Sequence, residues 1–300
     1  MRIVPLILIA LVLLSFGAGC LGGGGKGVPS TGTSPTSSQR LSTSSSGQET
    51  SRTSSTAHTT SSVYETGTGP SDTRTSPQRA CSIGVSSYTA NISTVIDFST
   101  EVTSGGVTRV QNVSILTSSR GYFDLNNGVM AINMTVRAYP EGARYVTRAI
   151  LTGGDAYLLS DGRWLHLGEG EKGYEGVLDL YRYNPLSIFI EEVNAGRCRA
   201  SGEGDELRIS CRPDGEDLKG LVSLLVGSPN GSTISVSSPS MELRILGGTP
   251  VNGTISLLFE VSYGYTDPYG GRGKVIERGL LLRRFNVLSV NRTVSVLPPG

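Results

Sequence analysis

Histidine and tryptophan are scarce in this chain of 300 residues, which contains two histidines and one tryptophan. His58 lies in a Ser/Thr-rich stretch, so the region after it has only His166, and this excludes most two-histidine metal sites. There is no Gly-x-Ser-x-Gly elbow or P-loop, and we expect the glycine-rich turns to lack the strand-to-helix context that cradles phosphate. The sequence therefore predicts a protein that is not an enzyme and holds no cofactor or metal.

Long runs of like charge are also lacking. The chain has 26 basic and 25 acidic residues, with a formal net charge of +1. Its basic residues are scattered without interleaved aromatic residues, which argues against binding to a phosphate backbone or to an anionic membrane through a polybasic patch. We expect no nucleic-acid partner.

The N-terminal apolar run is too short to span a membrane. It extends from Ile3 to Leu14 after Arg2, and even counted to Phe16 it falls short of the ~18 to 20 residues that a bilayer requires. Small residues then lead to Cys20, the order of a secretory signal that ends in a bacterial or archaeal lipobox. Residues 1–20 are interpreted as this signal peptide and Cys20 as the lipid attachment site. An uncleaved short anchor is the alternative, because Gly17 stands where a lipobox usually has leucine.

Residues 21–80 consist largely of Ser, Thr, Gly and Pro without apolar periodicity. Such a segment cannot bury enough surface to offset its ordering entropy, so we expect a disordered stalk. As a bare coil of about 55 residues it would span ~40 Å, and sugars on its hydroxyl groups would lengthen it. A glycosylated stalk and an unmodified linker are both open. The membrane is thus one expected partner, through the lipid anchor, and the outer domain would lie on the extracellular face of the cell membrane.

Residues 81–300 form the expected outer domain, in which period-two alternation is the dominant pattern. Met130, Ile132, Met134 and Val136 alternate with more polar residues, which predicts a strand with one apolar and one solvated face. A similar alternation covers residues 255–263. Further strands are expected at residues 93–102, 107–117, 144–151, 156–159, 163–167, 233–237, 241–246 and 274–290. Intervening turn formers indicate a meander of hairpins, a mostly β (α+β) fold.

Two regions break the alternation. Tyr174, Val177, Leu178 and Tyr181 recur at helical spacing, and a second helix is expected after Asn184 and Pro185, which suit its N-cap and first turn. Asp214 can cap a further helix that ends at residues 227–229.

Cys198 and Cys211 flank a predicted tight turn at Gly204 and Asp205. Pairing the strands about this turn places the two cysteines opposite each other at a non-hydrogen-bonded site, where Cα atoms lie ~4.5 Å apart. That distance suits a disulfide, which export would favour, and reduced thiols in the core are the alternative. Cys81 is left without a partner in the domain, either free or bonded to another chain.

Six Asn-x-Ser/Thr sequons are candidates for N-glycosylation. They begin at Asn91, Asn112, Asn133, Asn230, Asn252 and Asn291. Asn133 lies on the polar face of its predicted strand, as a glycan requires.

Several other polar and aromatic residues have a structural and a functional interpretation. His166 and Trp164 share a strand face, which favours packing or hydrogen bonding over catalysis. Glu191-Glu192 and the acidic cluster at residues 203–206 could suggest calcium or acid–base chemistry, but solvated surface is the preferred interpretation. The tyrosines at positions 263, 265 and 269 could form a partner-binding rim or simply lead a strand into a loop.

The order of elements is similar to that of a known family. A meander containing Tyr157 and the run Asp161-Gly162-Arg163-Trp164 is followed by a helical stretch with Asn184-Pro185-Leu186 and then by more strands. In this order the chain resembles the LolA/LppX-like lipoproteins over residues 81 to about 296. The resemblance implies a curved antiparallel half-barrel whose concave apolar face is covered by helices and receives lipid acyl chains. It brings no catalytic residues.

A membrane-anchored, non-catalytic surface lipoprotein that binds a lipid or other apolar ligand is therefore the leading hypothesis. The alternative is a structural or interaction module in which the helices fill the concavity and the domain contacts a surface-layer protein or transporter. The apolar groove is expected to contain Met130, Ile132, Met134, Leu178, Tyr181, Phe189, Leu221, Leu225, Leu257 and Phe259.

Overall fold

The computed structural model of the protein describes residues 83–171, 173–266 and 270–299. The expected signal peptide, Cys20, the stalk, Cys81 and Tyr269 lie outside these residues. The described strands form one 11-stranded sheet in which every pairing is antiparallel. The strands are β1 (Ser87–Ser104), β2 (Val107–Asp124), β3 (Val129–Tyr139), β4 (Ala143–Thr152), β5 (Asp155–Ser160), β6 (Arg163–Leu167), β7 (Cys198–Ser201), β8 (Glu206–Cys211), β9 (Thr233–Leu246), β10 (Thr249–Thr266) and β11 (Arg272–Val290). The helices are α2 (Tyr174–Arg182), α3 (Pro185–Asn194), the 3₁₀ helix η1 (Glu216–Leu218) and α4 (Lys219–Val226).

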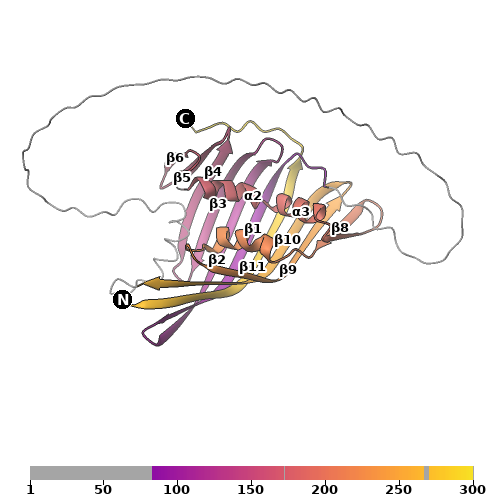
Figure 1. The fold of residues 1–300 in the computed structure, drawn as a ribbon. Coiled ribbons are helices and arrows are strands. Elements are labelled where there is room, and N and C mark those ends of the chain that lie inside the picture. Colours follow the sequence, from indigo (N-terminus) through magenta and orange to yellow (C-terminus); the bar gives the residue numbers. More distant parts are fainter. Residues whose placement is uncertain (1–82, 172, 267–269, 300) are drawn as a thin grey trace, which may run out of the picture. The chain divides into compact units, whose positions relative to one another are not determined.

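The strand order explains where the helices lie. It is β6-β5-β4-β3-β2-β1-β11-β10-β9-β8-β7, so two meanders meet where the first strand pairs with the last. This order puts β6 and β7 at opposite edges, and the connection between them, which contains α2 and α3, must cross the sheet. Figure 1 shows the helices over the inner side of the curved sheet. The expected mostly β half-barrel with helices on its concave face is therefore confirmed.

Alternation along the strands separates an inner from an outer face. In β1, Ile92 and Ile96 are buried while Asn91 and Asp97 are exposed. The structure confirms the strands expected from sequence and lengthens several of them. The long strands bury mainly apolar side chains on the inner face and carry mostly polar ones on the outer face, as expected for an antiparallel sheet with one wet side.

The two strands expected at residues 233–237 and 241–246 are one strand, β9. Ser240 pairs with Ser256 and Ser237 with Leu258, so Ser238 and Pro239 together oppose a single residue of β10. This is a β-bulge, and Ser238 has a φ of 51° there. A bulge accommodates a proline, which cannot donate to the ladder, and lets the strand continue past residues that resemble a break in the sequence.

Of the two caps expected from sequence, Asn184 caps its helix, whereas Asp214 stands one residue before the N-cap of a 3₁₀ helix. The Asn184 side chain accepts a hydrogen bond from Ser187 N at 3.0 Å, and Pro185 occupies the first turn of α3. Asp214 Oδ1 accepts a hydrogen bond from Glu216 N at 3.1 Å. That turn is the 3₁₀ helix η1, not the start of an α-helix as expected, because the α-helical pattern begins only at Lys219.

Candidate functional site

The inner face of the sheet and the helices packed on it bring together all ten of the expected groove residues. Met130, Ile132, Phe189, Leu221, Leu257 and Phe259 are at most 4% exposed. Met134, Leu178, Tyr181 and Leu225 are half-buried and pack against the same core. The ring of Phe189 on α3 lies 5.9 Å from that of Phe285 on β11, so the helix packs directly on the sheet. The ten residues share one interior, and their contact with a ligand stays a prediction.

A polar network fixes the junction of α2 and α3 to the sheet. The hydroxyl of Tyr88, on β1, donates to Asn184 Oδ1 at 2.7 Å. The Asn184 amide in turn donates to Tyr181 O at 2.6 Å and to Ser187 Oγ at 2.7 Å. Tyr88 is fully buried, and this burial raises the pKa of its phenol. Because these buried groups have partners within the network, they are assigned a structural role.

Arg283, on β11, is the buried cation beneath this junction. It is 5% exposed and donates from Nη1 to Tyr183 O at 2.6 Å. Its Nε has no hydrogen-bond partner among the described residues. Burial lowers the pKa of the guanidinium to about 10, so Arg283 is charged at neutral pH.

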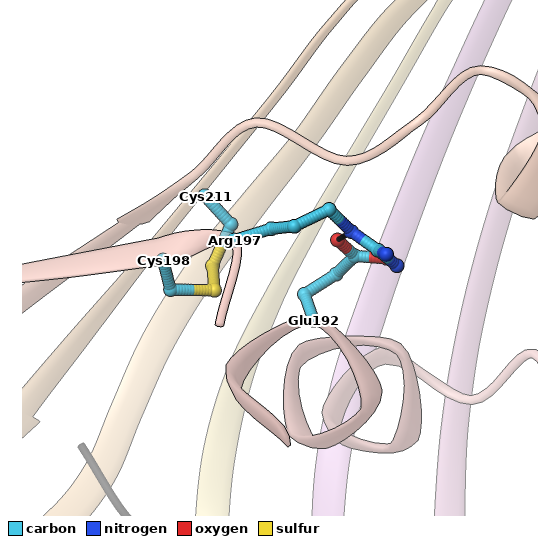
Figure 2. The surroundings of a disulfide bond; sticks show 4 residues. All are labelled: Glu192, Arg197, Cys198 and Cys211. Atoms are coloured by element: carbon cyan, nitrogen blue, oxygen red, sulfur yellow. Dashed lines mark hydrogen bonds and ion pairs between the residues drawn. A yellow bond between two sulfur atoms is a disulfide. The ribbon is translucent and has the colours of Figure 1, made fainter. Parts of the chain in front are cut away.

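At one edge of the sheet a disulfide joins β7 and β8. Their register places Cys198 opposite Cys211, as expected, and the two sulfur atoms are bonded with Cα atoms 4.0 Å apart. Figure 2 shows Arg197 next to this bond, reaching Glu192 of α3. Arg197 Nε donates to Glu192 Oε2 at 2.7 Å, and Arg197 Nη2 pairs with Asp217 at 2.8 Å.

This ion pair corrects one expectation. Glu192 is 2% exposed, so it is not solvated surface. The chain turns directly after α3, with Arg197 N donating to Glu192 O, and this places Arg197 beside the last turn of the helix, where its guanidinium compensates the buried carboxylate. Glu191 is exposed as expected, and so are Glu203 and Asp205 at the hairpin tip.

The second half of the inner face lies toward the tips of the β1–β2 and β10–β11 hairpins, which run past the helices (Figure 1). We call it the hairpin end and define it by Phe98, Thr100, Phe259, Val261, Val275 and Glu277. The rings of Phe98 and Phe259 lie 6.1 Å apart, on either side of Gly279. A Cβ atom at Gly279 would come within 2.4 Å of Phe98 Cβ, so this glycine lets the aromatic ring lie across the strand.

Two polar groups interrupt this apolar surface. Glu277 on β11 is directly opposite Thr100 on β1 and Val261 on β10. Glu277 and Thr100 are each 3% exposed. Burial raises the pKa of the Glu277 carboxyl to about 7. Sequence analysis missed this residue, although its position between Val275 and Leu281 in the inward register of β11 was a signal that could have found it.

The sequons lie mostly on the solvated surface. Asn91, Asn112, Asn133, Asn230 and Asn291 are exposed, and Asn252 is half-buried. Asn133 is exposed, in agreement with its place on the polar strand face. The Asn291 amide is engaged, because its Oδ1 accepts from Ser86 N at 2.8 Å. Asn112 borders an open depression of about 440 Å³ on the outer face that is also lined by Asp97, Tyr139 and Arg278.

One glycine-rich turn does lie between a strand and a helix, contrary to expectation. Gly168, Gly170 and Gly173 follow β6 and precede α2, with the spacing of a dinucleotide-binding loop. However, β6 is an antiparallel edge strand, and Glu171 Oε2 accepts from Gly168 N at 2.6 Å. The Gly168 N–H, which would have to bind phosphate, already donates to the Glu171 carboxylate. The described strands are all antiparallel, so they do not contain the parallel βαβ unit of such sites.

His166 has the packing role expected of it. Its ring stacks on Tyr157 at 5.0 Å, and its Nε2 lies 3.2 Å from Asp155. Within residues 83–299, apart from the four undescribed positions 172 and 267–269, no three His, Cys, Asp or Glu side chains group as metal ligands would.

Comparisons with known proteins give structural similarity only. No family model matches the sequence, and no curated protein does. Among solved structures, LprF from Mycobacterium bovis is similar at 12% identity and a TM-score of 0.34, over 72% of this chain and 90% of that one. A β-barrel-like protein with the DUF1849 domain from Brucella abortus matches at 12% identity and a TM-score of 0.24, over 67% and 98% of the two chains. A DUF1329 family protein from Desulfovibrio piger matches at 9% identity and a TM-score of 0.18, over 68% and 87%.

Proposed function

We propose that this protein is a membrane-anchored, non-catalytic surface lipoprotein whose outer domain binds a lipid or another apolar ligand on the inner face of its sheet. The observation that carries the proposal is the apolar inner face of the sheet, which continues from beneath the helices to the hairpin end and whose side chains are buried there too. Lipid chains have the chemistry that such a surface would accept.

The anchor at Cys20 supplies the second part of the proposal. In the described part of the chain no helix has the length and apolarity to cross a bilayer, and the sequence before Cys20 has the order of a lipoprotein signal. A Cys20→Ala variant should lose the acyl mass and leave the membrane fraction after cell lysis. Recovery of that variant in the membrane would favour the uncleaved anchor instead.

A structural or interaction module is the second candidate function. It is favoured by the close packing of α3 and α4 on the sheet, where Phe189, Leu221 and Val222 are fully buried. If the helices fill the whole concavity, the outer face with its sequons would be the surface that meets a partner, for example a surface-layer protein or transporter.

Ligand retention separates the two functions. The full-length chain, purified in a mild detergent, is incubated with vesicles of phosphatidylglycerol that carry a fluorescent fatty acid, re-isolated, and examined by native mass spectrometry. Retained lipid at defined stoichiometry is expected. A chain that takes up no labelled fatty acid and releases no lipid on solvent extraction would leave only the structural module.

A matched pair of variants locates the binding surface. Val261 lies on the inner face of β10 and is fully buried, whereas Leu258 on the outer face of the same strand is 46% exposed. Val261→Trp should lower lipid retention at least tenfold by filling the inner face, and Leu258→Trp should leave it unchanged. Equal loss in both variants would contradict binding on the inner face.

A further inference from the structure

Two unsatisfied polar side chains lie next to each other in the hairpin end. Thr100 and Glu277 are partners in the register of β1 and β11 and face the same side of the sheet. Directly opposed residues in an antiparallel pair have Cβ atoms about 4.5 to 5.5 Å apart. The hydroxyl and the carboxyl therefore form one polar spot.

Neither side chain has a hydrogen-bond partner among the described residues. Thr100 Oγ1 is buried without a hydrogen-bond partner in the described part of the chain. Glu277 is 3% exposed as a residue and no hydrogen bond or ion pair joins its carboxyl to a described residue, although its oxygens are not among the fully enclosed polar atoms that lack a partner. Nearly all buried polar groups in proteins are hydrogen-bonded, and an unpaired one costs free energy. Two such groups side by side indicate that a partner from outside this set of residues completes them.

The surroundings of the polar spot are apolar. Val261 and Val275 lie beside Glu277. The Phe98 and Phe259 rings lie on the same face, two residues along β1 from Thr100 and two residues along β10 from Val261. Tyr263 is the titratable neighbour: burial, and then the charge of Glu277, raise the pKa of its phenol. Since no cation of the described residues is paired with Glu277, a partner that brings a hydrogen-bond donor would stabilise the carboxyl most.

We propose that Thr100 and Glu277 bind the polar end of an otherwise apolar ligand, and that this end carries a hydrogen-bond donor, a hydroxyl or an amine, on a long hydrocarbon chain. The inference deepens the proposed function and rests on it. The apolar inner face holds the chain, while the carboxylate accepts the donor and the threonine hydroxyl contributes a second hydrogen bond. The two side chains thus select among ligands that the apolar surface alone would not distinguish.

The chemistry of the carboxyl explains this selection. A carboxylate has only acceptor positions, and a protonated carboxyl adds a single donor. A ligand that ends in an ether leaves these acceptors unpaired, and a site built to bind a hydroxyl rejects an analogue that lacks it. A ligand that ends in a carboxylate would in addition place a like charge beside Glu277 once that residue ionises.

The test uses ligands that differ only at this end. The full-length chain in mild detergent is titrated with 1-hexadecanol, 1-methoxyhexadecane and hexadecylamine, and bound ligand is counted by native mass spectrometry. The wild-type chain is expected to retain the alcohol about tenfold better than the ether. Hexadecylamine distinguishes an amine donor from a hydroxyl donor. Its retention relative to 1-hexadecanol should increase between pH 6 and pH 8 as Glu277 ionises.

Two variants and one control complete the experiment. Thr100→Val and Glu277→Gln should each reduce the preference for the alcohol over the ether to less than threefold while binding of the ether persists. Asp97→Asn, on the outer face of β1 and exposed, should leave the preference unchanged. Glu277→Gln conserves shape, so the test does not depend on whether Thr100→Val folds.

The outcomes separate the inference from the function on which it rests. If the wild-type chain retains none of the three ligands and no lipid from vesicles, the proposed function fails. If it retains alcohol and ether equally, or if the variants keep the wild-type preference, binding stands and the polar spot is not the selecting site.

Discussion

The two halves of the inner face differ in the hydrogen bonding of their buried polar groups. Beneath the helices, Tyr88 and Asn184 satisfy each other, and Arg283 donates to the Tyr183 carbonyl. At the hairpin end, Thr100 Oγ1 is buried without a partner among the described residues, and its neighbour Glu277 makes no hydrogen bond to any of them. Arg283 Nε also lacks a partner there, but its guanidinium keeps one hydrogen bond, to Tyr183 O. The comparison teaches that burial alone does not mark a functional residue, and that two neighbouring polar side chains without partners are the feature to test.

The largest expected effect lies in the helix-covered half. Phe189→Ala removes a fully buried ring that packs against Phe285, and should lower the free energy of unfolding by about 3 to 5 kcal/mol. Urea denaturation followed by tryptophan fluorescence or circular dichroism measures this change. Leu258→Ala on the exposed outer face is the control and should change stability much less. A small effect of Phe189→Ala would mean that the helices do not depend on this packing, and the distinction between the halves would weaken.

The second effect concerns the hairpin end and depends on pH. The pKa of Glu277 is raised from 4.5 to about 7 by burial, so the folded state binds a proton that the unfolded state has lost. This stabilising contribution is fully present below about pH 4.5 and is lost as pH rises through 7, a change of roughly 3 kcal/mol. Glu277→Gln should therefore flatten the stability profile between pH 4.5 and pH 7.5.

Denaturation midpoints of both proteins across this range provide the measurement. Asp97→Asn should keep the wild-type profile, since its side chain is exposed. A wild-type profile in Glu277→Gln would show that the carboxyl is not desolvated at the hairpin end.

A third prediction tests the ion pair at the edge of the covered half. Arg197→Met leaves the Glu192 carboxylate buried without its guanidinium, and should cost roughly 2 kcal/mol. This is less than a fully buried pair would lose, because the Arg197 side chain is 37% exposed. The double variant Glu192→Leu/Arg197→Met should recover most of the loss. If it does not, the ion pair stabilises this edge of the sheet through more than the neutralisation of two opposite charges.

The smallest effect distinguishes satisfied from unsatisfied groups. Tyr88→Phe removes a hydroxyl that donates to Asn184 Oδ1 and accepts from Leu186 N, and should destabilise the fold by about 1 kcal/mol. Thr100→Val removes a hydroxyl without a partner and should be neutral or slightly stabilising in the ligand-free chain. Matched thermal melts of the two variants compare them directly. Equal destabilisation would mean that the Thr100 hydroxyl makes a stabilising hydrogen bond, as the Tyr88 hydroxyl does.

The sequence predicted the local structure well because alternation and turn chemistry are local. The register of the cysteine hairpin followed from counting outward from Gly204 and Asp205, and the α3 cap from Asn184 and Pro185. The bulge at Ser238 and Pro239 was not predicted, since the same residues would equally end a strand.

The candidate site was less predictable, because it depends on contacts distant in sequence. The ten groove residues lie in or against one core, and their contact with a ligand stays a prediction; the sequence could not show that the helices pack directly on the sheet. Glu192 was assigned to the surface although its partner, Arg197, is only five residues away, because no pattern in the sequence shows that the side chain of Glu192 is buried. The polar spot requires the pairing of β1 with β11, and no local pattern gives that pairing.

That pairing has a consequence for how the domain is made. The seam at the middle of the sheet joins residues about 200 positions apart, such as Tyr88 and Val290. Non-local strand pairing is slow because loop closure must precede the contacts that reward it. If the chain is exported as proposed, the β1–β6 meander emerges first with the central edge of β1 unpaired, and β1 acquires its neighbour only once β11 has also emerged. We therefore expect the sheet to be completed only after export. Until β11 pairs with β1, the unpaired edge of β1 should be prone to aggregation.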